Sequence, residues 1–237
     1  MLSDFQESDI NGYHKFLWAH HLGYALPYEA SSRFGSENIP ASRRIFFSDL
    51  TRHLASIGVD AGRDIRSVLE IGCSLGYQLR HVETDVAPSA GELVGIDIDA
   101  YAVSEGKRFL QRVGSKVELI SGEMGDMDRL LGTKRFDLIF STGVLMYLHE
   151  TEAARIVDAM IRRSRILVAI TGPAHPEIDN RLLAHSVARR NDNSFIHNID
   201  SMLQKAGTEI LGRRWEGNKI VEGHTLYSVF AKGARES

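Results

Sequence analysis

The chain has 237 residues, with 28 Lys and Arg against 31 Asp and Glu, a formal net charge of −3 and 43% hydrophobic residues. These values are typical of one globular α/β domain with a modest appendage, and they exclude a protein built mainly to coat nucleic acid, which needs a concentrated basic face. The lone cysteine excludes an internal disulfide, no apolar run approaches the ~18 residues of a membrane span, and the acidic opening segment is unlike a secretory signal, so the composition favours the cytoplasm.

Two helical stretches are predicted within the first 60 residues. Apolar side chains recur at spacings of three and four from Phe5 to His21 and again from Ile45 to Ile57, where Gly58 ends the second pattern. The passage between them, residues 23–40, is rich in Gly, Pro, Ser and Tyr. We therefore expect residues 1–60 to form a helical cap or lid on a domain that comprises residues 61–237.

Short apolar runs alternate with longer amphipathic stretches from residue 67 onward. Runs rich in Val, Ile and Leu are typical of strands covered on both faces, and the stretches between them are typical of helices that connect parallel strands. The predicted parallel strands occupy residues 67–71, 92–97, 116–120, 136–140 and 165–170. An insertion around residues 171–200 follows, and such loops often shape binding pockets.

Two further strands, residues 209–215 and 225–231, are joined by a short link that contains Gly217. The link is too short for a helix. These strands are therefore expected to form an antiparallel hairpin at one edge of the sheet.

The loops after the predicted strands hold the candidate binding residues, because ligands of open α/β sheets lie beyond the carboxyl ends of the strands. The first strand leads into Glu70-Ile71-Gly72-Cys73-Ser74-Leu75-Gly76. A dinucleotide fingerprint would need glycine at positions 72, 74 and 77, where the chain has Gly72, Ser74 and Tyr77. A nicotinamide cofactor is therefore disfavoured, and no Gly-Lys-Ser or Gly-Lys-Thr of a phosphate-binding loop follows.

This loop resembles the first motif of class I S-adenosylmethionine-dependent methyltransferases, in which an acid is followed by two glycines, here Glu70, Gly72 and Gly76. Asp97, at the end of the second strand, is similar to the acid that binds both ribose hydroxyls in this family. The segment Ser121-Gly122-Glu123-Met124 is similar to the one beside the adenine. Residues 136–148 resemble the family pattern Phe-Asp-Leu-x-x-Ser-x-x-Val-Leu-x-x-Leu. The resemblance covers roughly residues 67–170.

The resemblance implies a Rossmann-like fold: a mostly parallel seven-stranded sheet with helices on both faces, an antiparallel C-terminal hairpin and a helical N-terminal extension. It also implies S-adenosylmethionine as the cofactor. Glu70 is expected to serve the ammonium group, directly or through the loop backbone, and Cys73 to be a small buried filler. The expected cofactor-binding residues are Glu70, Gly72, Cys73, Gly76, Asp97, Ile98, Glu123, Met124, Ser141 and Thr142.

The predicted acceptor is a polar small molecule, with hydroxyl methylation of a sugar or related metabolite ahead of amine methylation. After the fourth strand the chain has Ser141-Thr142-Gly143-Val144, which lacks the motifs of base-amine and cytosine-carbon methyltransferases and the metal-binding carboxylate of catechol-type enzymes. A metal-independent enzyme without a nucleic-acid or membrane partner is therefore expected, as a monomer or homodimer. Residues 142–148 and 164–167, with Trp18, Tyr24 and residues 33–35, are faintly similar to methylases associated with bacterial surface-sugar biosynthesis.

Two alternatives stay open: a catalytically inactive S-adenosylmethionine-binding partner protein, and N-methylation of a small-molecule amine. His149 follows the fourth-strand motif and is the candidate general base, because imidazole can accept a hydroxyl proton near neutrality. A surface histidine at a helix start is an equally open interpretation. Aromatic side chains near the N-terminus could exclude water and attract the sulfonium, or merely pack a helix on the core. The substrate or lid candidates are His20, His21, Tyr24, Tyr28 and His197.

Overall fold

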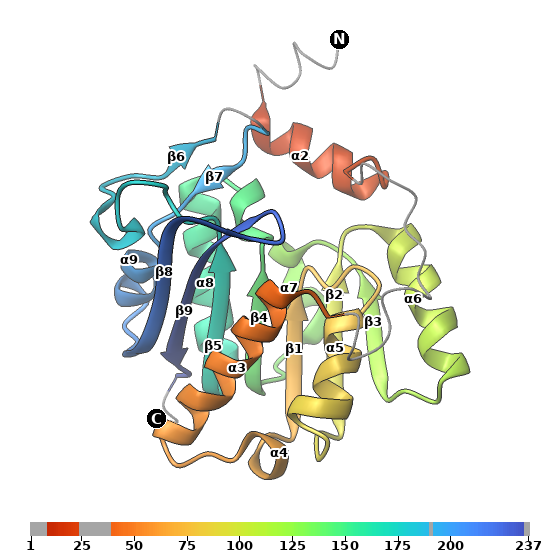
Figure 1. Ribbon diagram of the computed structural model, residues 1–237. Coiled ribbons are helices and arrows are strands. Elements are labelled where there is room, and N and C mark those ends of the chain that lie inside the picture. Colours follow the sequence, from red (N-terminus) through yellow and green to blue (C-terminus); the bar gives the residue numbers. More distant parts are fainter. Residues whose placement is uncertain (1–8, 24–38, 190–191, 235–237) are drawn as a thin grey trace.

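The computed structural model describes residues 9–23, 39–189 and 192–234, and its centre is a seven-stranded sheet in the order β3-β2-β1-β4-β5-β9-β8 (Figure 1). β1 to β5 run parallel, and β9 pairs antiparallel with both β5 and β8. This confirms the predicted mostly parallel sheet with an antiparallel hairpin at its edge. The strands are β1 (Ser67–Ile71), β2 (Glu92–Asp97), β3 (Val117–Ser121), β4 (Phe136–Thr142), β5 (Ser164–Gly172), β8 (Ile210–Val221) and β9 (His224–Lys232).

Helices cover both faces of the sheet, because alternate residues of each strand point to opposite sides. On β1, for example, Val68 packs in the core of one face and Leu69 in the core of the other. The first face carries α3 (Ala41–Ser56), α4 (Ala61–Asp64), α5 (Tyr77–His81), the π-helical turn η3 (Val82–Val86) and α6 (Ala100–Arg112). The second face carries α7 (Met127–Leu131), α8 (Glu150–Arg163) and α9 (Ile199–Lys205).

The C-terminal hairpin is longer than the sequence predicts. Gly217 was expected in the link between the strands, but it lies within β8, in a stretch where the register with β9 shifts between Trp215 and Ile220. The turn is formed instead by Glu222 and Gly223, which both have positive φ angles, of 49° and 81°. The turn of the hairpin therefore lies past the carboxyl end of β5, on the side of the sheet where the parallel strands end.

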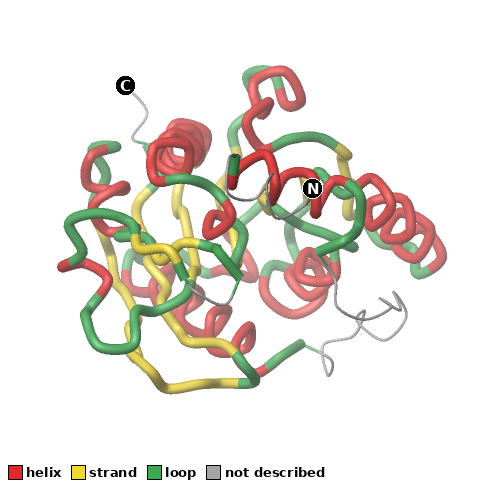
Figure 2. Tube along the Cα trace, turned by 90° about the horizontal axis from the view of Figure 1, so that it is seen from above, coloured by secondary structure: helices red, strands yellow, loops and turns green. Residues whose placement is uncertain are grey.

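Two segments lie above those carboxyl ends. Helix α2 (Ile10–Ala19) crosses over the sheet, and the view from above shows it lying across this end (Figure 2). The connection after β5 contains a short two-stranded sheet of β6 (Val187–Ala188) and β7 (Phe195–Ile196), which the sequence did not predict. The second helix of the first 60 residues, α3, does not lie above the strand ends. It packs Phe46, Leu50 and Leu54 into the core on one face of the sheet.

None of the helices that the structure describes is long and apolar enough to cross a membrane.

Candidate active site

A cavity of about 1360 Å³ lies at the carboxyl ends of the parallel strands. Its walls come from the loops after β1 to β5, and α2, the start of α3 and the β8–β9 hairpin complete it. Ligand cavities of roughly 300–1,000 Å³ hold one small molecule, so this volume has room for two. Seven of the ten expected cofactor-binding residues line it: Gly72, Cys73, Asp97, Ile98, Glu123, Met124 and Thr142.

The loop after β1 is held in a conformation that needs glycine. Gly72 has a φ of +78° and its N–H donates to the Ile96 carbonyl at 2.8 Å, while Gly76 has a φ of +77° where α5 begins. A Cβ atom on Gly72 would lie 2.2 Å from a methyl carbon of Val144. The missing side chain therefore allows close packing against the loop after β4.

Asp97, at the end of β2, links the loop after β1 to the loop after β2. Its carboxylate accepts hydrogen bonds from the backbone N–H of Ser74 at 2.6 Å and of Asp99 at 2.9 Å. Burial raises the pKa of Asp97, against the effect of these N–H groups, which lower it. An ionised carboxylate offers about four acceptor positions, so about two remain for ligand hydroxyls.

Glu70 is fully buried behind the cavity and does not line it. One carboxylate oxygen accepts from the Gln78 amide at 2.9 Å, and the other has no hydrogen-bond partner. The same Gln78 amide donates to the Thr142 hydroxyl at 2.8 Å, and both Gln78 and Thr142 line the cavity. The structure thus places Glu70 as the residue that orients Gln78.

Arg43, in the first turn of α3, is a cavity residue that the sequence interpretation missed. Its guanidinium donates to the Thr142 carbonyl at 3.4 Å, and this is its only hydrogen bond within the described part of the chain. Burial raises the pKa of the Glu70 carboxyl well above its usual value, and the positive charge of Arg43 partly opposes that rise. No local pattern in the sequence distinguishes Arg43 from its neighbour Arg44.

Glu70 should make stability depend on pH, and Glu70→Gln tests this. A buried carboxyl with a raised pKa stabilises the fold while it is protonated, and that contribution is lost as the pH rises from its usual value of about 4.5 toward the raised value. The unfolding free energy of the wild type should therefore fall relative to that of the neutral Glu70→Gln variant as the pH rises above about 4.5. Urea unfolding across this range measures the difference, and parallel curves for the two proteins would contradict it.

The end of β3 contributes Glu123 and Met124, at the start of a 3₁₀ turn. The Glu123 carboxylate is 2.7 Å from the ammonium of Lys15 on α2, and both side chains are about half exposed. Pairs this exposed contribute at most about 1 kcal/mol. The contact nevertheless shows that α2 reaches across to the far wall of the cavity.

Beyond β4 the cavity is lined by aromatic and polar groups. The Tyr147 ring lies 5.1 Å from that of His14 and 5.0 Å from that of Trp18, measured between centroids. Arg189 and Asp192 form an ion pair of 3.1 Å on the segment between β6 and β7. These residues come from three separate parts of the chain, and only the folded structure brings them together.

Cys73 and Ser141, two of the expected cofactor-binding residues, are buried and contact neighbouring strands. The Cys73 thiol is buried against Gly95, and burial raises its pKa well above the usual value, which fits the expected role as an inert filler. The Ser141 hydroxyl donates to the Ile71 carbonyl at 3.0 Å and is fully buried. Ser141 therefore ties β4 to β1 and does not face the cavity.

The structure does not bring the predicted acceptor-side histidines into the cavity. His149 is exposed at the start of α8, and its ring lies 4.8 Å from that of Phe195. His197 is buried, with one ring nitrogen 2.9 Å from the Leu145 carbonyl and the other 2.7 Å from the Ser186 hydroxyl, and burial lowers its pKa. Neither residue lines the cavity, so neither is placed to act on a bound molecule.

Two of the predicted lid residues, His20 and His21, contact other parts of the structure. His20 is exposed and its ring contacts the Phe16 carbonyl at 2.9 Å, while a ring nitrogen of His21 lies 2.5 Å from the Asp99 carboxylate. Both contacts hold the end of α2, and neither side chain lines the cavity. Tyr24 and Tyr28 lie outside the described residues.

The sheet order, with its reversal between β1 and β4 and its antiparallel β9, and the cavity at the strand ends agree with the fold that the sequence resemblance implies. Residues 68–165 match the family model of the methyltransferase domain. Among curated proteins, none matches the sequence significantly.

Solved structures agree on the fold. Magnesium protoporphyrin IX methyltransferase from Synechocystis PCC 6803 with bound SAH has a TM-score of 0.59 and 14% identity, over 98% of this chain and 97% of that one. The N-terminal domain of EvdMO1, in the presence of SAH and D-fucose, has a TM-score of 0.54 and 15% identity, over 81% and 83%. The [4+2]-cyclase SpnF has a TM-score of 0.58 and 15% identity, over 79% and 81%. The last of these is named for a different reaction, so the fold alone does not decide the chemistry.

Proposed function

We propose that the protein transfers a methyl group from S-adenosylmethionine to a hydroxyl of a polar small molecule, a sugar or related metabolite. The observation that supports this best is the extent of the cavity, which continues from the loops of β1 to β3 past β4 into a region lined by Tyr147, Arg189 and Asp192. Side chains that can exchange hydrogen bonds with hydroxyls suit such an acceptor.

The cofactor half of the cavity fits the donor molecule at three places. Arg43 offers a cation to its carboxylate, and the side-chain oxygens of Gln78 and Thr142, which line the same wall, can accept from its ammonium group. Asp97 has acceptor positions left for the ribose hydroxyls. Glu123 and Met124 stand at the end of β3, where the adenine would lie. The bound sulfonium supplies an electrophilic methyl group.

The chain's own contribution is positioning and the exclusion of water, which supply much of the acceleration of a displacement reaction. Helix α2 is suited to this as a lid. The Asn11 side chain donates to the Glu152 carboxylate at 3.1 Å and accepts from the His149 N–H at 2.9 Å, and Lys15 reaches Glu123. These few polar contacts hold α2 over the cavity and can be exchanged when a ligand enters or leaves.

The structural neighbours leave the acceptor open. EvdMO1 was crystallised with D-fucose present, which supports a sugar, whereas the Synechocystis enzyme is named for a porphyrin. Amine methylation of a small molecule and a non-catalytic S-adenosylmethionine-binding partner stay as alternatives.

The proposal is tested by incubating the purified protein with methyl-labelled S-adenosylmethionine and the small-molecule fraction of a cell extract. We expect labelled products whose fragmentation places the methyl group on oxygen. A methyl group found on nitrogen would favour the amine alternative. Binding of S-adenosylhomocysteine without transfer across many extracts would instead support the non-catalytic partner.

A further inference from the structure

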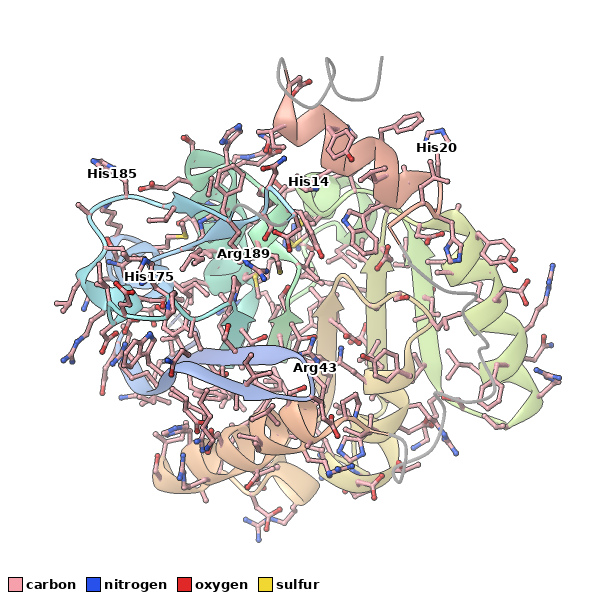
Figure 3. The ribbon with its side chains drawn as sticks, turned by 45° about the horizontal axis from the view of Figure 1, so that its top comes forward. His14, His20, Arg43, His175, His185 and Arg189 are labelled. Atoms are coloured by element: carbon pink, nitrogen blue, oxygen red, sulfur yellow. The ribbon has the colours of Figure 1, made fainter. Side chains whose placement is uncertain are left out.

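We propose that His14, on α2, is the general base that removes the proton from the acceptor hydroxyl. This inference rests on the proposed function and assigns the role predicted for His149 to a different residue. Among the histidine side chains that the structure describes, His14 is the one that lines the cavity, and it is 3% exposed. Figure 3 shows His14 and Arg189 between α2 and the strand ends, whereas His20 and His185 lie toward the outside.

The hydrogen bond of His14 identifies which nitrogen can act as a base. Nε2 lies 3.1 Å from the backbone carbonyl of Asn193. A carbonyl oxygen can only accept, so Nε2 must carry the hydrogen. In the neutral ring the lone pair is then on Nδ1, which makes no hydrogen bond to any residue within the described ranges. The carbonyl thus fixes the tautomer and the ring orientation, as an orienting group does for a catalytic imidazole.

The surroundings of His14 belong to the acceptor half of the cavity. Its ring packs against Tyr147, which follows β4, and Asn193 belongs to the segment between β6 and β7. The charged and titratable groups near it are Tyr13 and Lys15 on α2, Tyr147 after β4, and Arg189 with Asp192 opposite. Arg189 and Asp192 pair with each other, Lys15 pairs with Glu123, and the Glu152 carboxylate of α8 accepts from Asn11. None of these carboxylates is hydrogen-bonded to Nδ1 of His14.

The reaction balances with His14 as the proton acceptor. The acceptor's O–H bond breaks and its proton passes to Nδ1, while the oxygen forms a bond to the methyl carbon. The S–C bond breaks and its electron pair remains on sulfur as a neutral thioether. The imidazolium then returns its proton to water, and no oxidant, metal or further reactant is required.

The variant His14→Gln separates this role from a structural one. Its amide can donate to the Asn193 carbonyl as Nε2 does, but it cannot take up a proton at neutral pH. We expect the affinity for S-adenosylhomocysteine to change by less than about twofold and the transfer rate to fall by about 10²- to 10⁴-fold. The acid limb of the rate profile, which reports protonation of a base, should disappear. His185→Gln, at a side chain 88% exposed, is the matched control and should leave rate and profile unchanged.

A second measurement determines the tautomer of His14 and does not require methyl transfer. Nitrogen NMR of the ¹⁵N-histidine-labelled protein bound to S-adenosylhomocysteine, assigned with His14→Gln and recorded at a pH where the ring is neutral, should show hydrogen on Nε2 and not on Nδ1. Hydrogen on Nδ1, or undiminished transfer by His14→Gln, would overturn the proposal. If the wild type transfers no methyl group to any compound of the extract, the proposed function fails. The tautomer measurement still decides whether His14 has an unprotonated Nδ1 that could act as a base.

Discussion

Asp97→Ala is expected to weaken binding of S-adenosylhomocysteine by about 1–3 kcal/mol, or roughly 5- to 150-fold, as measured by calorimetry. The reason is that the Asp97 carboxylate, at the end of β2, has two roles. It can accept from the ribose hydroxyls, and it also holds the backbone N–H groups of Ser74 and Asp99. The variant therefore loses ligand hydrogen bonds and the link between two cofactor loops together.

A matched control exists at the opposite end of the sheet. The Asp137 carboxylate also accepts from two backbone N–H groups, those of Arg66 at 2.8 Å and Ser67 at 3.0 Å. Asp137→Ala should therefore lower stability for a comparable reason while leaving the affinity unchanged. Equal affinities of wild type and Asp97→Ala, or an equal loss in both variants, would remove Asp97 from the proposed site.

Gly72→Ala is expected to lower the free energy of unfolding by about 2–5 kcal/mol, measured by urea denaturation. Two costs add at this position. The φ of +78° lies in the left-handed region, which an L side chain resists, and the new methyl group would meet Val144 at 2.2 Å. Because the loop after β1 forms part of the cavity, cofactor affinity should fall as well.

The two costs at Gly72 can be measured separately. Val144→Ala in the Gly72→Ala protein removes most of the collision and should recover part of the loss, while the backbone strain remains. Gly91→Ala is the control, since a Cβ there meets nothing within 4 Å and its φ lies outside the left-handed region. A Gly72→Ala protein as stable as Gly91→Ala would show that the loop relaxes freely.

Local patterns were sufficient for most of the fold. The strand run 92–97 is reproduced residue for residue, and its apolar residues Leu93, Val94 and Ile96 are buried, as expected of a strand covered on both faces. The hairpin end was less predictable, since Gly217 is compatible with a turn or with a shift of register, and the choice depends on pairing with β9. The β6–β7 pair consists of two-residue strands, which are too short to leave a periodic signal.

The sequence by itself determined the five parallel strands, the loops that end them and the acids and glycines those loops carry, because these depend on neighbours along the chain. Only the tertiary structure decided which side chains face the cavity. Arg43 and Thr142 are 99 residues apart, and His14 and Asn193 are 179 apart. Such contacts are set by how helices pack over the sheet and not by any local pattern, which is why His14 lies inside the cavity and His149 lies at the surface.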